Sequence, residues 1–337
     1  STPKPSSAAS DVYKRQHYIY APKEDSCIRQ KWRLKDKSLE ARSIPKNIAQ
    51  VYTLSPGADF NRKSKKDFNF LLSKFNFAID KGFSEVGLLF DDIDINNIGI
   101  ESDDKDLGKF HGELISEVIT KLGLNNGWFC PSIYCESFSK KGIQNDKYLD
   151  GVSETINNDL FFLWTGPKVI SDFISQDHLK ELGQVIKNPV VIWDNFYAND
   201  YCPTRLFLGD ITGRDFFRGN PYGHVINGTG LINTDEFLIS KVFDKKKRIN
   251  LPSELLPLFD SPFKNINKSE IKKMIRNSKD IKKAVFETTD DNLFLEWKPY
   301  LVQALNDIEL IKNFKSKQTI ETYLHRRYSP LVSQTFN

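Results

Sequence analysis

The stretch VGLLFDDID, at residues 86–94, sets the first expectation for the fold. A run without charged side chains is followed at once by Asp91, Asp92 and Asp94. Short continuous apolar runs are typical of strands that are buried on both faces, as in a parallel sheet covered by helices. The carboxylates then lie at the carboxyl end of a strand, where α/β folds place their active sites.

Similar runs recur along the chain and alternate with helical patterns. They lie at residues 18–20, 49–54, 128–130, 160–163 and 189–192, with a weaker last strand at 224–226 or 230–232. Apolar residues three or four apart predict helices over 65–80, 107–122 and 175–187. A doubly wound sheet would share this alternation, but the sequence has neither GxGxxG nor a Walker lysine loop. We therefore expect an α/β fold of the (β/α)8 TIM-barrel type.

The strand rhythm divides the chain into three parts. It starts at His17 and gives about seven strands, so we predict a barrel domain over residues 17–250 that is N-terminally truncated by one βα unit. Residues 1–16 are polar and rich in Ser and Pro, and we expect a disordered or extraneous leader. Residues 251–337 predict a small α-helical region, with a helix that starts or kinks at Pro299.

Composition and charge exclude several classes of protein. The 337 residues are 39% hydrophobic and 27% charged, which is typical of a globular chain and not of a disordered one. A net charge of +4 is too small to indicate a nucleic-acid partner, and no apolar run is long enough to cross a membrane. The four cysteines form no CxxC pair and no zinc-binding spacing.

The adjacent carboxylates are the strongest chemical signal. Neighbouring carboxylates cannot both ionise cheaply, so one of Asp91 and Asp92 can keep its proton near neutral pH. A protonated acid beside a carboxylate is the pair that cleaves a glycosidic bond. A purely structural role, in which these aspartates cap backbone amides, stays open. A DDxxD metal motif would need an acid at Ile95, so we expect no metal.

A second polar cluster follows the strand at 189–192. Trp193 and Asn195 come directly after it, and Asp200 follows five residues later. Aromatic rings stack on the C–H faces of sugars, while Asn and Asp bind hydroxyl and amide groups. Structurally, Trp193 could instead fill the barrel and Asn195 could end a strand.

Several motifs, in order and at suitable spacing, resemble glycoside hydrolase family 84. They are YAPKED (20–25), LLFDDID (88–94), CP with YC (130–135), WTGPKV (164–169), VIWDN with AND (191–200) and RLFLG (205–209). The resemblance runs from about His17 to about Asp244. It implies a β-N-acetylglucosaminidase that acts on O-GlcNAc-modified proteins or GlcNAc-terminated glycans, without a metal or organic cofactor.

The resemblance also implies residue roles. Asp91 would accept a hydrogen bond from the substrate's 2-acetamido N–H, and Asp92 would be the general acid and then the general base. Sugar contacts would come from Lys23, Tyr134, Trp193, Asn195, Asp200 and Asn233. The family has Asn-Pro where this chain has Asn233-Thr234, so Asn227 is a rival for the last of these roles.

One departure from the family keeps other readings open. The family's barrel begins with a strand that ends in a Gly-Phe-Tyr-Gly-type motif, and residues 1–16 contain none. We therefore expect an unstable or weakly active chain, and an inactive sugar-binding pseudoenzyme is the alternative. The family resemblance is also compatible with a homodimer and with a cytoplasmic or nuclear location.

Overall fold

The computed structural model of the chain describes residues 17–22, 25–35, 39, 48–57, 59–91, 105–216, 220–243, 251–264, 266, 268–287 and 292–329. These residues belong to two compact units. The half-barrel unit comprises the described residues of Val12–Trp193 and Gly213–Val225. The helical unit comprises those of Asp194–Thr212 and Ile226–Asn337.

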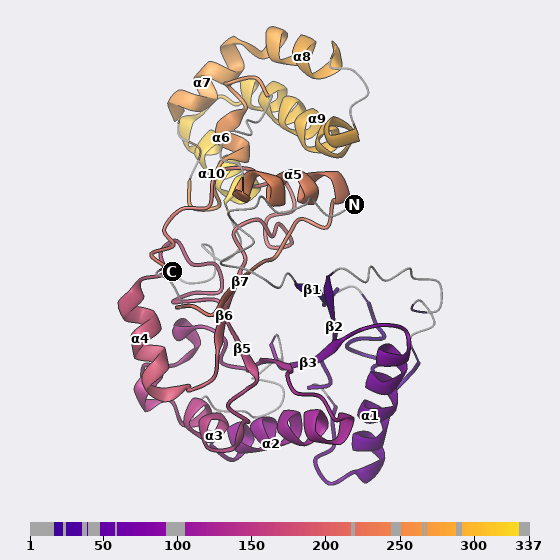
Figure 1. Ribbon diagram of the computed structural model, residues 1–337. Helices are drawn as coiled ribbons and strands as arrows, with labels where there is room; N and C mark the ends of the chain where they lie inside the picture. Colours follow the sequence, from indigo (N-terminus) through magenta and orange to yellow (C-terminus); the bar gives the residue numbers. More distant parts are fainter. Residues whose placement is uncertain are drawn as a thin grey trace. The chain divides into compact units, whose positions relative to one another are not determined.

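A single parallel sheet forms the centre of the half-barrel unit. In the described part of the chain its strands are β1 (His17–Tyr20), β2 (Ala49–Leu54), β3 (Glu85–Leu89), β4 (Trp128–Cys130), β5 (Phe161–Trp164), β6 (Val190–Asp194) and β7 (Gly223–Ile226). Each strand lies beside the next one in the chain, in the order β1-β2-β3-β4-β5-β6-β7, and the sheet curls (Figure 1). A doubly wound sheet would reverse its strand order at a switch point. The unreversed, curled order confirms the predicted (β/α)8-type architecture with seven strands present.

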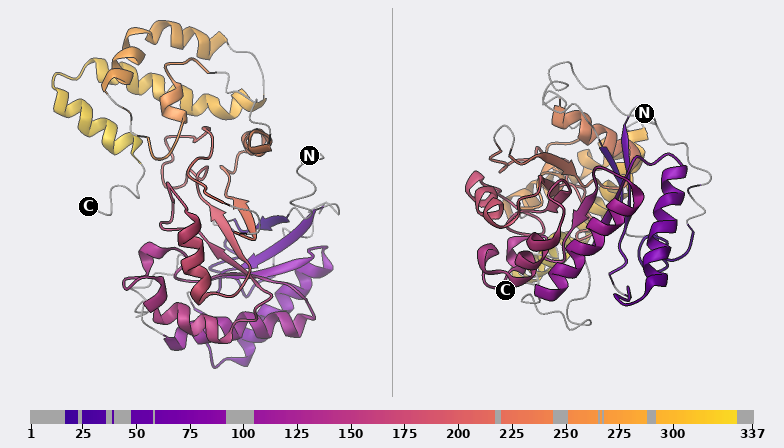
Figure 2. Two further views of the ribbon diagram at one scale, coloured as in Figure 1. Left: turned by 60° about the vertical axis from the view of Figure 1, so that its left-hand side comes forward. Right: turned by 60° about the horizontal axis from the view of Figure 1, so that its bottom comes forward.

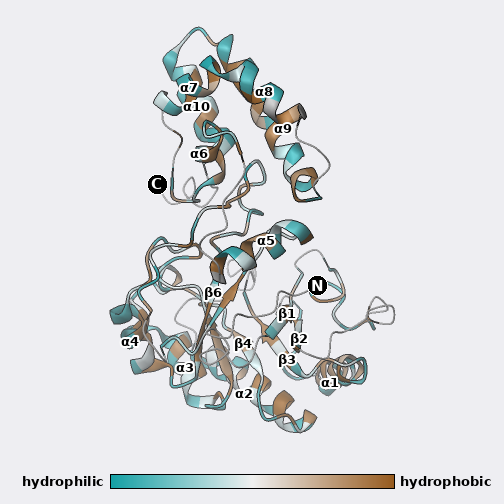
Figure 3. Ribbon diagram, turned by 45° about the horizontal axis from the view of Figure 1, so that its top comes forward, coloured by the Kyte–Doolittle hydropathy of each residue, from teal (hydrophilic) through white to brown (hydrophobic). Residues whose placement is uncertain are grey.

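Helices cover the convex side of this sheet. They are α1 (Lys65–Asp80), α2 (Lys105–Leu122), α3 (Lys147–Thr155) and α4 (Gln176–Val185), as Figures 1 and 2 show. Two short 3₁₀ turns, η2 (Glu136–Phe138) and η3 (Ile143–Asn145), lie between β4 and α3. Figure 3 shows hydrophilic and hydrophobic residues alternating along α2, as expected for a helix with one face on the sheet.

Side chains of the strands alternate between two apolar clusters. Leu88, Phe129 and Ile192 belong to the outer cluster, which the helices cover. Leu89, Cys130 and Val191 belong to an inner cluster on the concave side. Because successive residues of a strand point to opposite faces, β1 to β6 each contribute to both clusters. This double burial explains why the strands appear in the sequence as continuous apolar runs.

The predicted helices and strands are largely confirmed. The ranges 65–80, 107–122 and 175–187 correspond to α1, α2 and α4 within two residues at each end. The weak last strand is β7, whereas the alternative at 230–232 is wrong because α5 begins at Ile232. The residues 147–155 form α3, which the sequence analysis did not predict because nine residues carry little periodic signal.

The helical unit contains α5 (Ile232–Phe243), α6 (Leu256–Phe259), α7 (Lys268–Arg276), α8 (Ser278–Glu287), α9 (Asn292–Lys312) and α10 (Lys317–Tyr328). Trp297, Leu301 and Ile308 of α9 lie in its apolar core. Of the two expectations for Pro299, a helix start there is wrong, because α9 begins at Asn292 and Pro299 lies inside it, while a kink stays a prediction. Burial of the apolar stripe on both sides of Pro299 offsets the cost of about 3 kcal/mol for a proline inside a helix.

Candidate active site

Two of the predicted site residues, Lys23 and Asp92, lie outside the described residues. The others lie at the carboxyl ends of strands or in the helical unit. Asp91, Tyr134 and Trp193 belong to the half-barrel unit, while Asn195, Asp200 and Asn233 belong to the helical unit. Each unit therefore has its own set of candidate groups.

Asp91 follows β3 directly on the concave side of the sheet. The backbone N–H of Phe90 donates to the carbonyl of Cys130 at 2.9 Å, which extends the pairing of β3 with β4 beyond the last strand residue. Leu89 belongs to the inner cluster and Phe90 to the outer one, so alternation directs Asp91 inward. The Oδ1 atom of Asp91 is shielded from solvent. A carboxylate on this inner rim is suited to accept a hydrogen bond from a bound ligand.

Tyr134 lies in the loop that follows β4, and its side chain is buried. Its ring packs edge-on against Phe138 with centroids 5.0 Å apart. Its backbone carbonyl accepts from the N–H of Thr165 at 2.9 Å, and the N–H of Glu136 donates to Gly166 at 3.1 Å. These bonds join the loops after β4 and β5. They fix the backbone from which the Tyr134 ring projects into the inner cluster.

A buried histidine of α4 contacts the loop after β4 and the end of β5. His178 of α4 accepts at Nε2 from the indole N–H of Trp164 at 2.9 Å. Its Nδ1 lies 3.2 Å from a carboxylate oxygen of Glu136. Since Nε2 is the acceptor, Nδ1 carries the proton of the neutral ring. Burial lowers the pKa of His178, so the ring stays neutral at physiological pH.

Trp193 ends the apolar part of β6 and is half-buried. It packs against the same inner cluster that contains Tyr134. The structure therefore brings two predicted sugar-contacting rings to one apolar surface on the concave side of the sheet. An apolar surface with a carboxylate on its rim is the combination that sugar-binding sites use.

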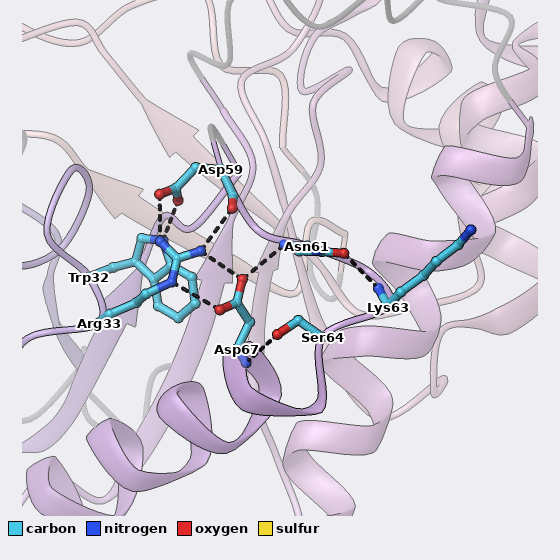
Figure 4. A network of polar contacts seen from close by, with 7 residues as sticks. All are labelled: Trp32, Arg33, Asp59, Asn61, Lys63, Ser64 and Asp67. Carbon is cyan, nitrogen blue, oxygen red and sulfur yellow. Dashed lines mark hydrogen bonds and ion pairs between the residues drawn. The ribbon is translucent and has the colours of Figure 1, made fainter.

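The segment after Lys23 is tied to the start of α1 by the polar network in Figure 4. The guanidinium of Arg33 donates to Asp67 at 2.6 Å and to Asp59 at 2.5 Å. Trp32 donates from its indole N–H to Asp59 at 2.7 Å. The hydrogen bond from Arg33 lowers the pKa of Asp67, even though burial opposes this. The network anchors the loop that follows the YAPKED motif.

In the helical unit, Asn195 pairs with Asn227, the alternative to Asn233 for the last predicted sugar contact. The side-chain N–H of Asn227 donates to Oδ1 of Asn195 at 2.9 Å. The backbone N–H of Asn227 also donates to the carbonyl of Asp194 at 2.9 Å. Both asparagines are half-buried. The structure thus brings Asn195 and Asn227 together.

The carboxylate of Asp235 holds the turn that carries Asn227. It accepts from the N–H and hydroxyl of Thr229, at 2.7 and 2.8 Å, and from the N–H of Gly230 at 3.0 Å. Burial raises the pKa of Asp235, and the bonds from Thr229 oppose the rise. These bonds fix the turn directly after Asn227, so the position of its amide is set by the fold.

Asn233 is engaged elsewhere in the helical unit. Its backbone and side-chain N–H groups donate to Oε1 of Glu296 at 3.0 and 2.7 Å. The other carboxylate oxygen accepts from the N–H and hydroxyl of Thr234, both at 2.7 Å. Burial opposes the ionisation of Glu296, but the bonds from Thr234 and Asn233 outweigh it and lower its pKa. Glu296 therefore caps the first turn of α5, and the side chain of Asn233 belongs to that cap.

Asp200 is exposed, and a buried arginine anchors the loop in which it lies. Asn199 donates from its side chain to the carbonyl of Arg205 at 3.4 Å and to the hydroxyl of Tyr300 at 3.2 Å. Arg205 is 1% exposed. It donates to the backbone carbonyls of Leu258, Lys264, Tyr328, Pro257 and Ser261.

The described residues offer neither a metal site nor a membrane-spanning helix. Within the described ranges, no three His, Cys, Asp or Glu side chains are grouped so that they could hold a metal ion. Among the helices of that part of the chain, none is both long and apolar enough to span a membrane. The cysteines 130, 135 and 202 are buried thiols, and burial raises the pKa of Cys135 to about 11, so it is a poor nucleophile.

Comparisons with known proteins agree on one group of enzymes. A family model described as beta-N-acetylglucosaminidase matches residues 8–218. Proteins called protein O-GlcNAcase from Rattus norvegicus and Mus musculus are each 35% identical to the chain over 209 residues. The match covers 58% of this chain but only 23% of each relative, so the chain spans less than a quarter of their length.

A solved structure extends the likeness to the fold. It is an aspartate-to-asparagine mutant of the O-GlcNAc hydrolase of Thermobaculum terrenum, with a TM-score of 0.65 and 19% sequence identity. The alignment covers 94% of this chain and 83% of that one. At this identity the likeness shows a shared fold, which includes the curled parallel sheet and its helices.

Proposed function

Because the chain belongs to the β-N-acetylglucosaminidase family, glycoside hydrolase family 84, we propose that it removes β-linked N-acetylglucosamine from serine and threonine of O-GlcNAc-modified proteins. The names of the matched relatives support this substrate. The observation that carries the proposal is the position of Asp91 at the inner carboxyl end of β3, in the unit whose inner cluster holds Tyr134 and Trp193.

The proposed reaction uses the substrate's own acetamido group as the nucleophile. Asp91 accepts a hydrogen bond from the acetamido N–H and so directs the acetamido carbonyl oxygen to the anomeric carbon. As that C–O bond forms, the bond to the serine or threonine oxygen breaks, and the leaving oxygen takes the proton of Asp92. The product of this step is an oxazolinium ion, the protonated oxazoline, whose N–H stays hydrogen-bonded to Asp91. The carboxylate of Asp92 then takes a proton from water as that water attacks the anomeric carbon. The C–O bond of the oxazolinium ring breaks and the acetamido group re-forms, with net retention of configuration.

The sugar contacts that the family resemblance implies are part of the same proposal. Trp193 offers an apolar face for the ring, and Tyr134 a hydroxyl for the acetamido group. Asn195 and Asp200 offer hydrogen-bonding groups for the sugar hydroxyls. The family resemblance adds Lys23 to the proposed sugar contacts.

For the last sugar contact, the geometry supports Asn227 over Asn233. Asn227 pairs with Asn195 at 2.9 Å, whereas the amide N–H of Asn233 is bound by Glu296 at 2.7 Å. We expect Asn227→Ala to raise KM for an aryl β-N-acetylglucosaminide about tenfold, since one hydrogen bond to a ligand contributes about 1.4 kcal/mol. Asn233→Ala should leave KM within twofold. A larger KM effect in Asn233→Ala would return the role to Asn233.

The first experiment measures hydrolysis of an aryl β-N-acetylglucosaminide from pH 4 to pH 9. Asp92→Asn should remove turnover of substrates with poor leaving groups. Asp106→Asn, at an exposed aspartate of α2, is the matched control and should keep full activity. Substrates with one to three fluorines on the acetyl group test the nucleophile. Each fluorine withdraws electrons from the acetamido oxygen and should slow turnover, whereas a carboxylate nucleophile would be almost insensitive.

The outcomes also separate the alternatives. Turnover of GlcNAc-terminated glycans but not of O-GlcNAc peptides would replace the proposed substrate with free glycans. Binding of an oxazoline mimic without turnover by a folded chain would indicate a sugar-binding pseudoenzyme. We propose that the substrates are cytoplasmic and nuclear O-GlcNAc proteins. Cell fractionation tests whether the chain itself occurs in these compartments.

A further inference from the structure

A buried histidine and tyrosine lie behind the rim that carries Asp91 and Tyr134. His111 belongs to α2 and Tyr148 to α3, and they are 3% and 1% exposed. Nδ1 of His111 lies 2.9 Å from the hydroxyl of Tyr148. The mechanism proposed above uses neither group. A buried polar pair with no assigned role needs a physical explanation, since its desolvation costs stability.

Helices α2 and α3 pack so closely that the positions of His111 and Tyr148 relative to each other are fixed. A Cβ atom added to Gly108 of α2 would lie 2.0 Å from the carbonyl oxygen of Tyr148. One added to Gly151 of α3 would lie 2.1 Å from the carbonyl oxygen of Lys105. Backbone therefore packs on backbone at this crossing. The side chains of His111 and Tyr148 project from a rigid base.

The direction of the hydrogen bonds follows from the donors present. The backbone N–H of Ser132 donates to the hydroxyl of Tyr148 at 3.0 Å, so the proton of that hydroxyl is available to Nδ1 of His111. Burial lowers the pKa of His111 to about 3, with a smaller contribution from the charge of Arg62. Burial raises the pKa of Tyr148. Both groups are therefore neutral over the physiological range.

The pair connects the ends of two neighbouring strands. The ring of His111 stacks on that of Phe90, with centroids 3.8 Å apart and planes 12° apart, and Phe90 directly precedes Asp91. At its other end, Tyr148 holds Ser132, which lies two residues before Tyr134. One set of contacts thus holds the residue before Asp91 and the backbone two residues before Tyr134.

We propose that His111 and Tyr148 are positioning residues that set the distance between Asp91 and Tyr134, and so the orientation of the substrate's acetamido group. The inference rests on the proposed function. In substrate-assisted hydrolysis the acetamido oxygen must reach the anomeric carbon in line. A displacement of about 1 Å can cost about 100-fold in rate. Ground-state binding depends on many other contacts and should change less.

Tyr148→Phe tests the proposal, because it keeps the ring and removes only the hydroxyl. We expect kcat on an aryl β-N-acetylglucosaminide to fall about 10- to 100-fold while KM changes less than threefold. Affinity for an oxazoline-mimicking inhibitor should fall with kcat/KM. Affinity for a sugar-like inhibitor without an acetamido group should not change.

Thr155→Val is the matched control. The hydroxyl of Thr155 on α3 donates to the carbonyl of Lys109 on α2 at 2.9 Å, so its loss weakens the same helix pair without touching either strand end. This variant should lose a similar amount of thermal stability and keep kcat. Equal kcat losses in Thr155→Val and Tyr148→Phe would reduce the pair to a structural role and overturn the proposal, as would full kcat in Tyr148→Phe.

A second pair of variants keeps the test valid if Tyr148→Phe does not fold. Asn and Leu have nearly the same shape, but Asn can place an acceptor where Nδ1 of His111 lies. We expect His111→Asn to keep at least fivefold more kcat than His111→Leu. Equal values would overturn the proposal.

A wild-type chain that binds the oxazoline mimic without turnover would refute the proposed hydrolysis alone. The inference would then be judged by inhibitor affinity in the same variants. A wild-type chain that neither hydrolyses nor binds would refute both.

Discussion

The two units of this chain hold their candidate site residues in different ways. In the half-barrel unit, neutral groups do so: the ring of His111 packs on Phe90, and Tyr148 binds the backbone of Ser132. In the helical unit, charged groups do so: Arg205 binds backbone carbonyls behind the Asp200 loop, and Glu296 caps α5.

The difference follows from where the backbone hydrogen bonds go. The backbone at the end of a strand is already hydrogen-bonded to the neighbouring strand, as Phe90 is to Cys130. Only a small neutral contact is then needed to satisfy the remaining backbone groups. Behind the Asp200 loop and at the start of α5, by contrast, backbone carbonyls and amides are satisfied by one guanidinium and one carboxylate. Each of these groups makes several charge-assisted bonds. The groups of the first arrangement act in their neutral form, whereas those of the second act through their charge.

The largest effect is expected from Arg205→Met. Removal of the guanidinium leaves several buried carbonyls without a donor, which should cost about 3–5 kcal/mol in the free energy of unfolding. Arg205→Lys should recover little, because one ammonium cannot reach carbonyls spread along α6 and the end of α10. Denaturant unfolding with hydrogen exchange will show whether the loss is confined to the helical unit. A loss below 1 kcal/mol would contradict the comparison.

The half-barrel unit should instead be sensitive to acid through His111. Its pKa is near 3 in the folded chain and about 6.5 when unfolded, so protons bind preferentially to the unfolded state. Stability should be unaffected above pH 6.5 and should fall by up to about 1.4 kcal/mol per pH unit between pH 6.5 and pH 3. Comparison of wild type with His111→Asn isolates this contribution. Parallel pH curves for the two proteins would show that His111 does not titrate as described.

Glu296→Gln should have a moderate effect on the helical unit. An amide cannot accept all the bonds that Asn233 and Thr234 donate, and it removes the negative charge from the start of α5, so we expect a loss of about 1–2 kcal/mol. The pKa of Glu296 is lowered in the folded chain. Its stabilisation is therefore present above pH 4.5 and declines as the pH falls through the folded pKa. The difference between the melting temperatures of variant and wild type should shrink below pH 4.

The smallest effect is expected from Asp59→Asn in the network of Figure 4. The side chain of Asp59 is 53% exposed, and the ion pair of Arg33 with the more buried Asp67 remains. Exposed ion pairs contribute about 0–1 kcal/mol, so the loss should stay below about 1 kcal/mol and vanish in high salt. Asp67→Asn should cost more, and a reversed order would show that exposure does not govern this network.

Much of the architecture followed from local sequence pattern. The apolar runs predicted the parallel strands, and the period of the helices predicted α1, α2 and α4 within two residues at each end. The carboxylates after β3 stood out because a charged cluster next to a buried run is a local signal. The motifs also pointed to the family that the comparisons then showed.

Some features had no such signal. Asn227 pairs with Asn195 from 32 positions away, and Glu296 binds Asn233 from 63 positions away. His111 and Tyr148, 37 positions apart, appear in the sequence as ordinary members of two helices. Only the folded chain shows that one asparagine faces another while its rival caps a helix.

The physical reason lies in the range of the forces. Hydrophobic period and backbone geometry act over a few residues, so the sequence by itself determined the strands, the helices α1, α2 and α4 and the rim on which Asp91 lies. A hydrogen bond requires its two atoms to be about 3 Å apart, and for distant residues only tertiary packing sets that distance. The tertiary structure therefore decided which polar side chains are engaged by the fold, and which lie beside the candidate site.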